Sequence, residues 1–252
     1  MKSMQNYKMT IAYDGRRYMG FKLIKEAEDK TIQGKLESIL GRLYEEPVEV
    51  FSAIQTDASV HAQGQVVHFH APQGDFSTGE IRAYFEKYLP DDIIVLEIAK
   101  VDDRFHSRLQ AETFTYQYRL WKKDARQRPL FERQYVNVMD TKLDISQMKK
   151  AAKLIEGEHD FTAFSSRSKI KNPIKNVTAI ELIEDENEIR VKITANSYLI
   201  NMERIIVGSL IQIGTGQKKL ADIEKAFTMK DPKFVGHKAM AAALSLMEVH
   251  YK

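Results

Sequence analysis

The 252-residue sequence contains no cysteine and only six prolines. Without cysteine there is no disulfide bond, no cysteine-ligated zinc or iron–sulfur cluster and no thiol nucleophile. Residues 1–20 mix charged with apolar residues and lack the apolar centre of a signal peptide. The most apolar run, Ile205–Ile213, is far shorter than the roughly 20 residues that a membrane helix needs. We therefore expect a soluble cytoplasmic protein that is not bound to a membrane.

A large excess of one charge is also lacking, because 38 Lys and Arg residues face 35 Asp and Glu residues, for a formal net charge of +3. This balance argues only weakly for a polyanionic partner. The basic residues gather, however, in two runs at 119–133 and 167–175. One basic run usually forms a solvent-exposed face of the protein. Two basic runs in one chain favour a nucleic-acid partner more strongly than one run does.

Hydrophobic spacing predicts the same order of elements, β-α-β-β-α-β, twice along the chain. In the first half we expect strands at 7–13, 48–52, 65–70 and 93–101 and helices at 31–43 and 77–89. In the second half we expect strands at 116–121, 177–184, 188–195 and 244–251, helices at 145–155 and 202–213, and a shorter helix at 222–228.

Each half is thus predicted to be a split β-α-β, ferredoxin-like unit. Such units leave one face of the sheet bare of helices. We therefore expect an α+β fold in which two ferredoxin-like (βαββαβ) halves join into one antiparallel sheet, with helices on the outer face and a central cleft. The expected domains are 1–104, which carries the loop around Asp57, and 105–252. Chemistry is expected in the cleft.

Common signatures of enzymatic sites are absent from the sequence. It has no glycine-rich phosphate loop and no nucleophile elbow of the serine hydrolases. His61, His68 and His70 leave a zinc site, and with it a metal-dependent hydrolase, as one alternative. The alternation of His68 and His70 with apolar residues instead favours the outward face of an antiparallel strand.

Asp57 is the most informative acidic residue. It lies in a polar loop between two predicted strands, and its small neighbours would let a planar ligand approach the carboxylate. A loop Asp most often forms a turn with its own backbone, so Asp57 by itself does not establish a catalytic site.

A set of short motifs runs through nearly the whole chain, from about Tyr7 to Tyr251, in an order more specific than any one of them. They are Tyr13-Asp14-Gly15 with Tyr18 and Gly20, Thr56-Asp57-Ala58 with Val60-His61-Ala62, residues 64–69, Phe105-His106 with Arg108, Tyr116 with Tyr118, residues 159–162, Met202 with Arg204, residues 206–210, and Gly214 with Gly216. In this order the motifs resemble those of the TruA-type tRNA pseudouridine synthases.

The resemblance implies isomerisation of uridine to pseudouridine in the anticodon stem-loop of tRNA, where the family's targets are positions 38–40. It also implies that no cofactor, no nucleotide cofactor and no metal is used, and that a homodimer holds one tRNA in paired clefts. By match, Asp57 is the catalytic carboxylate, acting either as nucleophile or as base. Tyr116 would stack on the target ring, and Arg204 would pair with Asp57 and hold it ionised.

Other interpretations of Arg204 and Tyr116 stay open from the sequence, since Arg204 could extend to solvent and Tyr116 could be an ordinary strand aromatic.

The target base must also leave its stack, which costs a few kcal/mol. Cationic and polar contacts to the RNA would offset that cost. The candidates for such contacts are Arg16, Arg17, Gln55, Arg108, Lys122, Lys123 and Arg167.

The sequence departs from the family pattern at several positions. Ile54, Gln55 and Ser59 stand where the family has Gly, Arg and Gly, and Phe114, Phe21 and Ile205 replace a basic residue, Trp and Asn. Gln55 is the most consequential change, because the family's Arg is thought to help occupy the space of the flipped base. The alternative function is therefore a catalytically impaired homologue that acts as an RNA-binding module.

Overall fold

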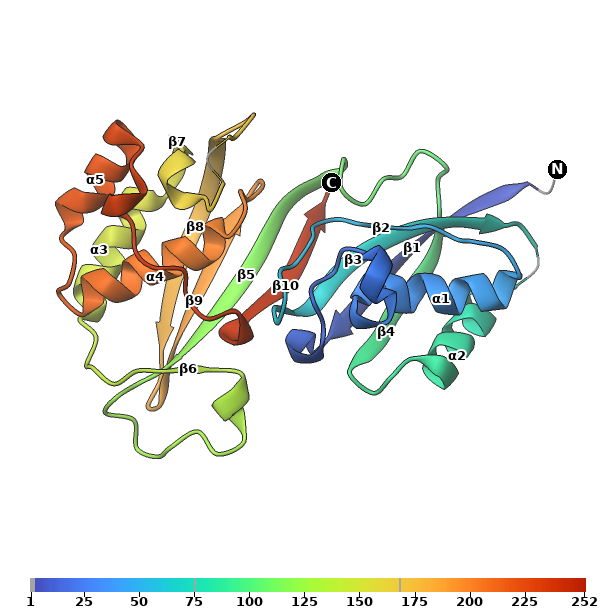
Figure 1. Cartoon of the computed structure of the whole chain (residues 1–252), viewed down its shortest axis with the longest axis horizontal. Coiled ribbons are helices and arrows are strands. Elements are labelled where there is room, and N and C mark those ends of the chain that lie inside the picture. Colours follow the sequence, from blue (N-terminus) through green and yellow to red (C-terminus); the bar gives the residue numbers. More distant parts are fainter. Residues whose placement is uncertain (1–2, 75, 168) are drawn as a thin grey trace. The chain divides into compact units, whose positions relative to one another are not determined.

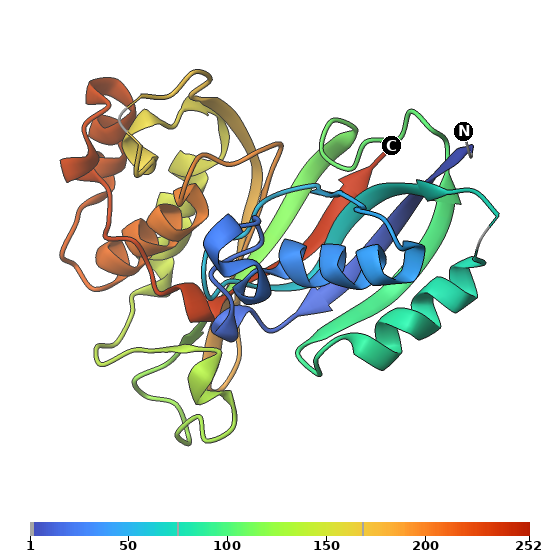
Figure 2. The same ribbon diagram turned by 45° about the vertical axis from the view of Figure 1, so that its right-hand side comes forward.

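The computed structural model, drawn in Figures 1 and 2, describes residues 3–74, 76–167 and 169–252. The chain divides into two compact units. The first unit comprises Met1–Glu112 and Leu246–Lys252, and the second unit comprises Thr113–Ser245. The last strand thus returns to the first unit, which the order of elements along the sequence cannot reveal. The domains expected at 1–104 and 105–252 stay a prediction.

The first unit is a sheet with two long helices. Its strands are β1 (Met4–Tyr13), β2 (Val50–Ser52), β3 (His61–Pro72), β4 (Ile93–Val101) and most of β10 (Leu244–Tyr251). The strand order is β4-β1-β3-β10, and β2 also pairs with β3. The register of β1 against β3 and β4 is antiparallel. Helices α1 (Ile32–Tyr44) and α2 (Thr78–Tyr88) lie on one face of this sheet (Figure 1). Every element expected in this half is present.

Local sequence accounts for the N-termini of these helices and for the buried face of β1. Thr31 caps α1 by accepting a hydrogen bond from the backbone of Gly34. Ser77 and Glu80 form a capping box at the start of α2. Along β1 buried and half-buried side chains alternate, because successive residues of a strand point to opposite faces.

The second unit has the strand order β5-β9-β8-β7. Its strands are β5 (Ala111–Trp121, of which residues from 113 belong to this unit), β6 (Asn137–Val138), β7 (Gly157–Asp160), β8 (Ile174–Glu184) and β9 (Glu188–Ala195), and its helices are α3 (Ile145–Ile155), α4 (Met202–Gly214) and α5 (Leu220–Met229). β6 and β7 were not expected, because one has two residues and the other, Gly-Glu-His-Asp, has no apolar alternation. β6 pairs with β5 in parallel.

Six short 3-10 helices complete the described chain, at Gly15–Arg17, Lys25–Lys30, Glu132–Gln134, Thr162–Phe164, Pro232–Phe234 and Ala241–Ala243. The expected α+β class with predominantly antiparallel strands is confirmed. Among the helices of residues 3–74, 76–167 and 169–252, none has the combined length and hydrophobicity needed to cross a bilayer.

Candidate functional site

The loop that carries Asp57 connects β2 to β3 in the first unit. Asp57 is half-buried, and its carbonyl oxygen accepts a hydrogen bond of 3.2 Å from the backbone of Val60, which closes a tight turn. Within that turn Ser59 has a φ of 64°, the left-handed conformation that favours glycine. Glycine, which the family pattern has at this position, would adopt this conformation without strain, and this chain adopts it with serine.

The end of β1 and the segment that follows it support this loop. The hydroxyl group of Tyr13 lies 2.7 Å from Oγ1 of Thr56. The backbone of Phe21 donates a hydrogen bond of 3.0 Å to the carbonyl oxygen of Thr56, and Ser59 donates one of 3.3 Å to Tyr18. These bonds bracket Asp57 on both sides, so the loop is held in position by residues about 40 positions earlier in the chain.

Two glycines of the same segment allow this close approach. Gly20 has a φ of 109°, and a Cβ atom there would lie 2.8 Å from the carbonyl oxygen of Thr56. A Cβ atom on Gly15 would overlap the carbonyl group of Val60. Neither position accommodates a larger residue without moving the loop. The spacing of Gly15 and Gly20 in the sequence motif thus reflects contact with the Asp57 loop.

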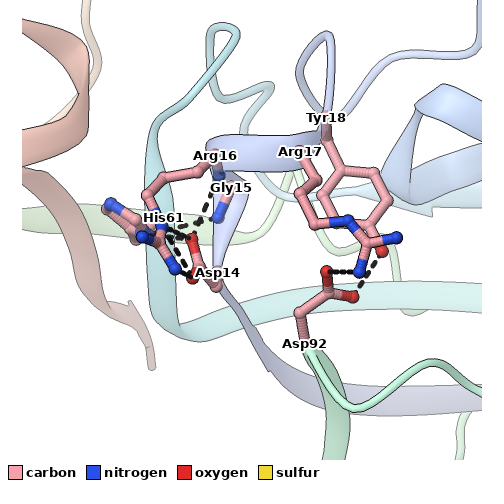
Figure 3. Close-up of polar contacts among 7 residues, drawn as sticks. All are labelled: Asp14, Gly15, Arg16, Arg17, Tyr18, His61 and Asp92. Carbon is pink, nitrogen blue, oxygen red and sulfur yellow. Dashed lines mark hydrogen bonds and ion pairs between the residues drawn. The ribbon is translucent and has the colours of Figure 1, made fainter. Parts of the chain in front are cut away.

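A polar network holds the far end of the loop, where β3 begins (Figure 3). The carboxylate of Asp14 accepts hydrogen bonds from Nε of Arg16 at 2.9 and 3.0 Å. Nδ1 of His61 lies 3.2 Å from the Asp14 carboxylate and 3.2 Å from the backbone nitrogen of Gly15. Arg16, expected as an RNA contact, therefore also forms an ion pair within the first unit.

A second group in Figure 3 surrounds Asp92. Tyr18 donates a hydrogen bond of 2.5 Å to Asp92, and Nη1 of Arg17 lies 3.2 Å from the same carboxylate. Burial and the neighbouring Asp92 raise the pKa of Tyr18 well above its usual value, so it remains the donor. The Arg17 side chain is 78% exposed, which leaves it accessible to a ligand despite the ion pair.

In the second unit, Tyr116 lies in β5 and is only 2% exposed. Its ring meets that of Tyr198 edge to face, with 5.2 Å between the ring centroids. The Tyr198 hydroxyl group lies 2.8 Å from the carbonyl oxygen of Ile193 and 3.1 Å from that of Phe114. Burial raises the pKa of Tyr198 well above 10, which keeps this hydroxyl group a donor. Tyr198 was not identified from the sequence, since its ring meets a strand that lies about 80 residues earlier in the chain.

Arg204 lies in the first turn of α4 and is half-buried. Its Nε donates a hydrogen bond of 2.8 Å to the carbonyl oxygen of Ala239, and its Nη1 donates one of 3.2 Å to the Asn201 side chain. Asn201 also donates to Ser166 at 3.1 Å. The guanidinium is thus anchored by the backbone and by an amide. Asn201, a further residue that the sequence did not indicate, has a φ of 63° at the N-terminus of α4.

The remaining candidates differ in exposure. Gln55, Arg108, Lys123 and Arg167 are exposed. Lys122 instead forms an ion pair of 2.9 Å with Glu184, and this hydrogen bond raises the Lys122 pKa. Asp57 and Gln55 belong to the first unit, whereas Tyr116 and Arg204 belong to the second. The expected pairing of Asp57 with Arg204 stays a prediction.

The histidines considered as metal ligands have other neighbours. The ring of His68 stacks on Phe51 with 5.0 Å between centroids, and its Nδ1 lies 2.8 Å from Oγ of Ser107. Burial and the nearby His106 and His70 lower the His68 pKa to about 4. Within the described ranges, no group of three His, Asp or Glu side chains is arranged to hold a metal ion.

Comparison with known proteins gives consistent results. A family model described as tRNA pseudouridine synthase matches residues 151–252. The tRNA pseudouridine synthase A 2 of Bacillus anthracis is 36% identical over 249 residues, covering 98% of this chain and 100% of the relative. The tRNA pseudouridine synthase A of Bacillus sp. (strain KSM-64) is 38% identical over 234 residues, covering 92% of this chain and 94% of the relative.

Among solved structures, the crystal structure of an archaeal box H/ACA sRNP Nop10-Cbf5 complex aligns with 93% of this chain and 60% of that chain, at 9% identity and a TM-score of 0.35. That similarity is too low to bear on the fold. The two bacterial relatives match along almost their whole length, in agreement with the motif order of the sequence. The chain therefore belongs to the tRNA pseudouridine synthase A family.

Proposed function

We propose that this protein isomerises uridine to pseudouridine in tRNA. The reaction breaks the bond between N1 of uracil and C1′ of ribose and forms a bond between C5 and C1′. C5 loses a proton and N1 gains one, so the atoms balance without a co-substrate. Family membership through relatives named tRNA pseudouridine synthase A is the observation that carries this proposal.

Asp57 is proposed as the catalytic carboxylate, acting as nucleophile or base. Support comes from its loop, which hydrogen bonds from Tyr13, Phe21 and Ser59 hold in one conformation. Such rigidity favours catalysis, because a reactive group held near its productive geometry loses little entropy during the reaction. Asp57 is also only half-buried in the structure.

Tyr116 is proposed to contact the target base, and Arg204 to pair with Asp57. The edge-to-face contact with Tyr198 restricts the Tyr116 ring, and two hydrogen bonds restrict the Arg204 guanidinium. A guanidinium beside a carboxylate would favour its ionised form, which either chemical role needs. Both assignments rest on the match to the family motifs.

The substrate is proposed to be the anticodon stem-loop at tRNA positions 38–40, bound by a cytoplasmic homodimer. The exposed Arg17, Arg108, Lys123 and Arg167 are suited to phosphate contacts that offset base extrusion. Arg16 and Lys122 already face Asp14 and Glu184, so RNA binding would require them to share or exchange those partners. The oligomeric state can be measured by sedimentation equilibrium, which would give twice the mass of one chain.

The proposed function is tested with tRNA transcripts that carry tritium at C5 of uridine. Wild-type protein should release tritium and form pseudouridine, which chemical mapping would locate. Asp57→Asn should release none while it still binds tRNA, since the substitution preserves the shape of the side chain. Tight, salt-sensitive tRNA binding by a wild-type protein that forms no pseudouridine would instead support the RNA-binding module.

A further inference from the structure

A cluster of lysines borders two adjoining cavities in the second unit, between the start of α3 and the end of the β8–β9 hairpin. The cavities have volumes of about 140 and 520 Å³, and both are lined by Ile145 and Glu184. Their six lining lysines are Lys122, Lys123, Lys142, Lys149, Lys150 and Lys153, and we call this region the lysine trough. α3 contacts β8 along this side of the unit (Figure 1).

Charge in the lysine trough is strongly unbalanced. Against its six lysines the lining contains only two acidic residues, Asp124 and Glu184. Each of these acids is already in an ion pair, with Lys142 at 3.3 Å and with Lys122 at 2.9 Å. The lining therefore carries a net charge of about +4, whereas the whole chain carries only +3.

Three of the lysines, Lys123, Lys149 and Lys150, are exposed. Lys153 pairs with Glu156 at 2.7 Å, but within the described ranges no ion pair is found for Lys123, Lys149 or Lys150. Like charges held close together repel one another, so this arrangement costs free energy unless an anion binds. These three ammonium groups are therefore the ones most available to an anionic ligand.

The first turn of α3 borders the lysine trough through Ile145 and Ser146. The N-terminus of this helix is already occupied, because the carboxylate of Asp144 accepts a hydrogen bond of 3.0 Å from the backbone of Gln147. An anionic ligand would therefore bind the lysines rather than the end of the helix.

The lysine trough is separate from Tyr116, the residue proposed to contact the target base. Lys122 is six residues beyond Tyr116, just after the end of β5, and a strand rises about 3.3 Å per residue. The two side chains therefore start roughly 20 Å apart. A ligand in the lysine trough would contact a part of the RNA well away from the target base.

We propose that the lysine trough binds the phosphate backbone of tRNA outside the segment that contains the target uridine. This inference rests on the proposed function. An open site lined by flexible point charges is suited to a sequence-independent backbone contact. A compact phosphate compound would instead need an enclosed set of converging donors.

The test compares Lys149→Gln/Lys150→Gln with wild type on full-length tRNA and on an isolated anticodon stem-loop. The matched control, Lys25→Gln/Lys87→Gln, removes the same charge from exposed positions of the first unit. For full-length tRNA we expect the trough variant to raise KM about 10-fold and to lower the slope of log Kd against log salt by about 2. Its kcat, its KM for the stem-loop and its thermal unfolding should match wild type.

Three outcomes separate the possibilities. An unchanged KM and salt slope for full-length tRNA in an active trough variant would overturn the inference. An equal loss in the control variant would also overturn it, since net charge alone would then be responsible. Wild-type protein that forms no pseudouridine would instead refute the proposed function, and binding titrations with tRNA would still decide whether the lysine trough contacts RNA.

Discussion

The hydroxyl group of Tyr13 lies 2.7 Å from Oγ1 of Thr56, 43 residues away in the sequence. Thr56 directly precedes Asp57, so this bond fixes the proposed catalytic loop to β1. Burial raises the pKa of Tyr13 to about 12, and the phenol therefore stays protonated at any working pH. The support given to Asp57 from this side should not depend on pH.

Tyr13→Phe removes that hydrogen bond and keeps the ring. We expect kcat to fall about three- to tenfold and the free energy of unfolding to fall by about 1 kcal/mol, because Thr56 loses one partner in a buried site. KM for tRNA should be unchanged. The control is Tyr84→Phe, which changes a tyrosine of α2 that contacts Tyr88. A Tyr13→Phe enzyme with the kcat of wild type would show that this bond does not position the loop.

Gly20→Ala should displace the Asp57 loop. The new Cβ would lie 2.8 Å from the carbonyl oxygen of Thr56, and the residue would keep a positive φ. We expect a loss of about 2 to 3 kcal/mol in the free energy of unfolding and a large loss of kcat. Gly216→Ala is the matched control, because Gly216 also has a positive φ but open space around its Cβ position. Chemical denaturation should separate the two variants, and equal effects would argue against loop contact.

Asn201 is expected to position Arg204 through the hydrogen bond from Nη1. Asn201→Gly preserves the left-handed backbone while removing the amide, so kcat should fall about fivefold with little change in stability. Asn201→Ala should lower kcat similarly and also destabilise the fold, since alanine adopts a positive φ at a cost of about 1 kcal/mol. Steady-state kinetics and thermal unfolding of both variants provide the test. Unchanged kcat in both would remove Asn201 from the positioning of Arg204.

Gln55→Arg restores the residue that the family pattern has before Thr-Asp. Gln55 is exposed, so the longer cation fits without a packing penalty. We expect kcat to rise several-fold and KM for tRNA to fall, because a cation beside an extruded base offsets the cost of extrusion. Gln55→Lys serves as the comparison, since it adds charge without the planar guanidinium. An equal gain in kcat from both variants would indicate a purely electrostatic effect. If neither variant raises kcat, the rest of the loop compensates for the missing arginine.

His68 should make stability depend on pH. Its pKa is about 4 in the folded chain, lowered by burial and by His106 and His70, against 6.5 for the free side chain. Between these values the unfolded chain binds a proton that the folded chain does not, so stability is lost as the pH falls from about 6.5 to about 4. His68→Gln should flatten this slope, whereas His250→Gln, at an exposed position, should not. Denaturation midpoints across that range provide the measurement.

Elements with a regular hydrophobic period were predictable from the sequence. The predicted strands 93–101, 188–195 and 244–251 agree with β4, β9 and β10, and α3 spans the predicted range. The motif order identified the family. Irregular or polar elements such as β7 were not predicted, because a hydrophobic pattern exists only where one face of an element is buried and the other is not.

The sequence by itself determined the helices and strands that have a hydrophobic pattern, and the motifs that mark the family, since each depends on residues close together along the chain. Only the tertiary structure decided which side chains support Asp57, that Arg16 and Lys122 pair with Asp14 and Glu184, and that β10 ends in the first unit. The physical reason is that these contacts join residues that are distant in sequence. A charged side chain can also pair with any of several neighbours of opposite charge. Their outcome depends on how the folded elements pack, which local periodicity does not encode.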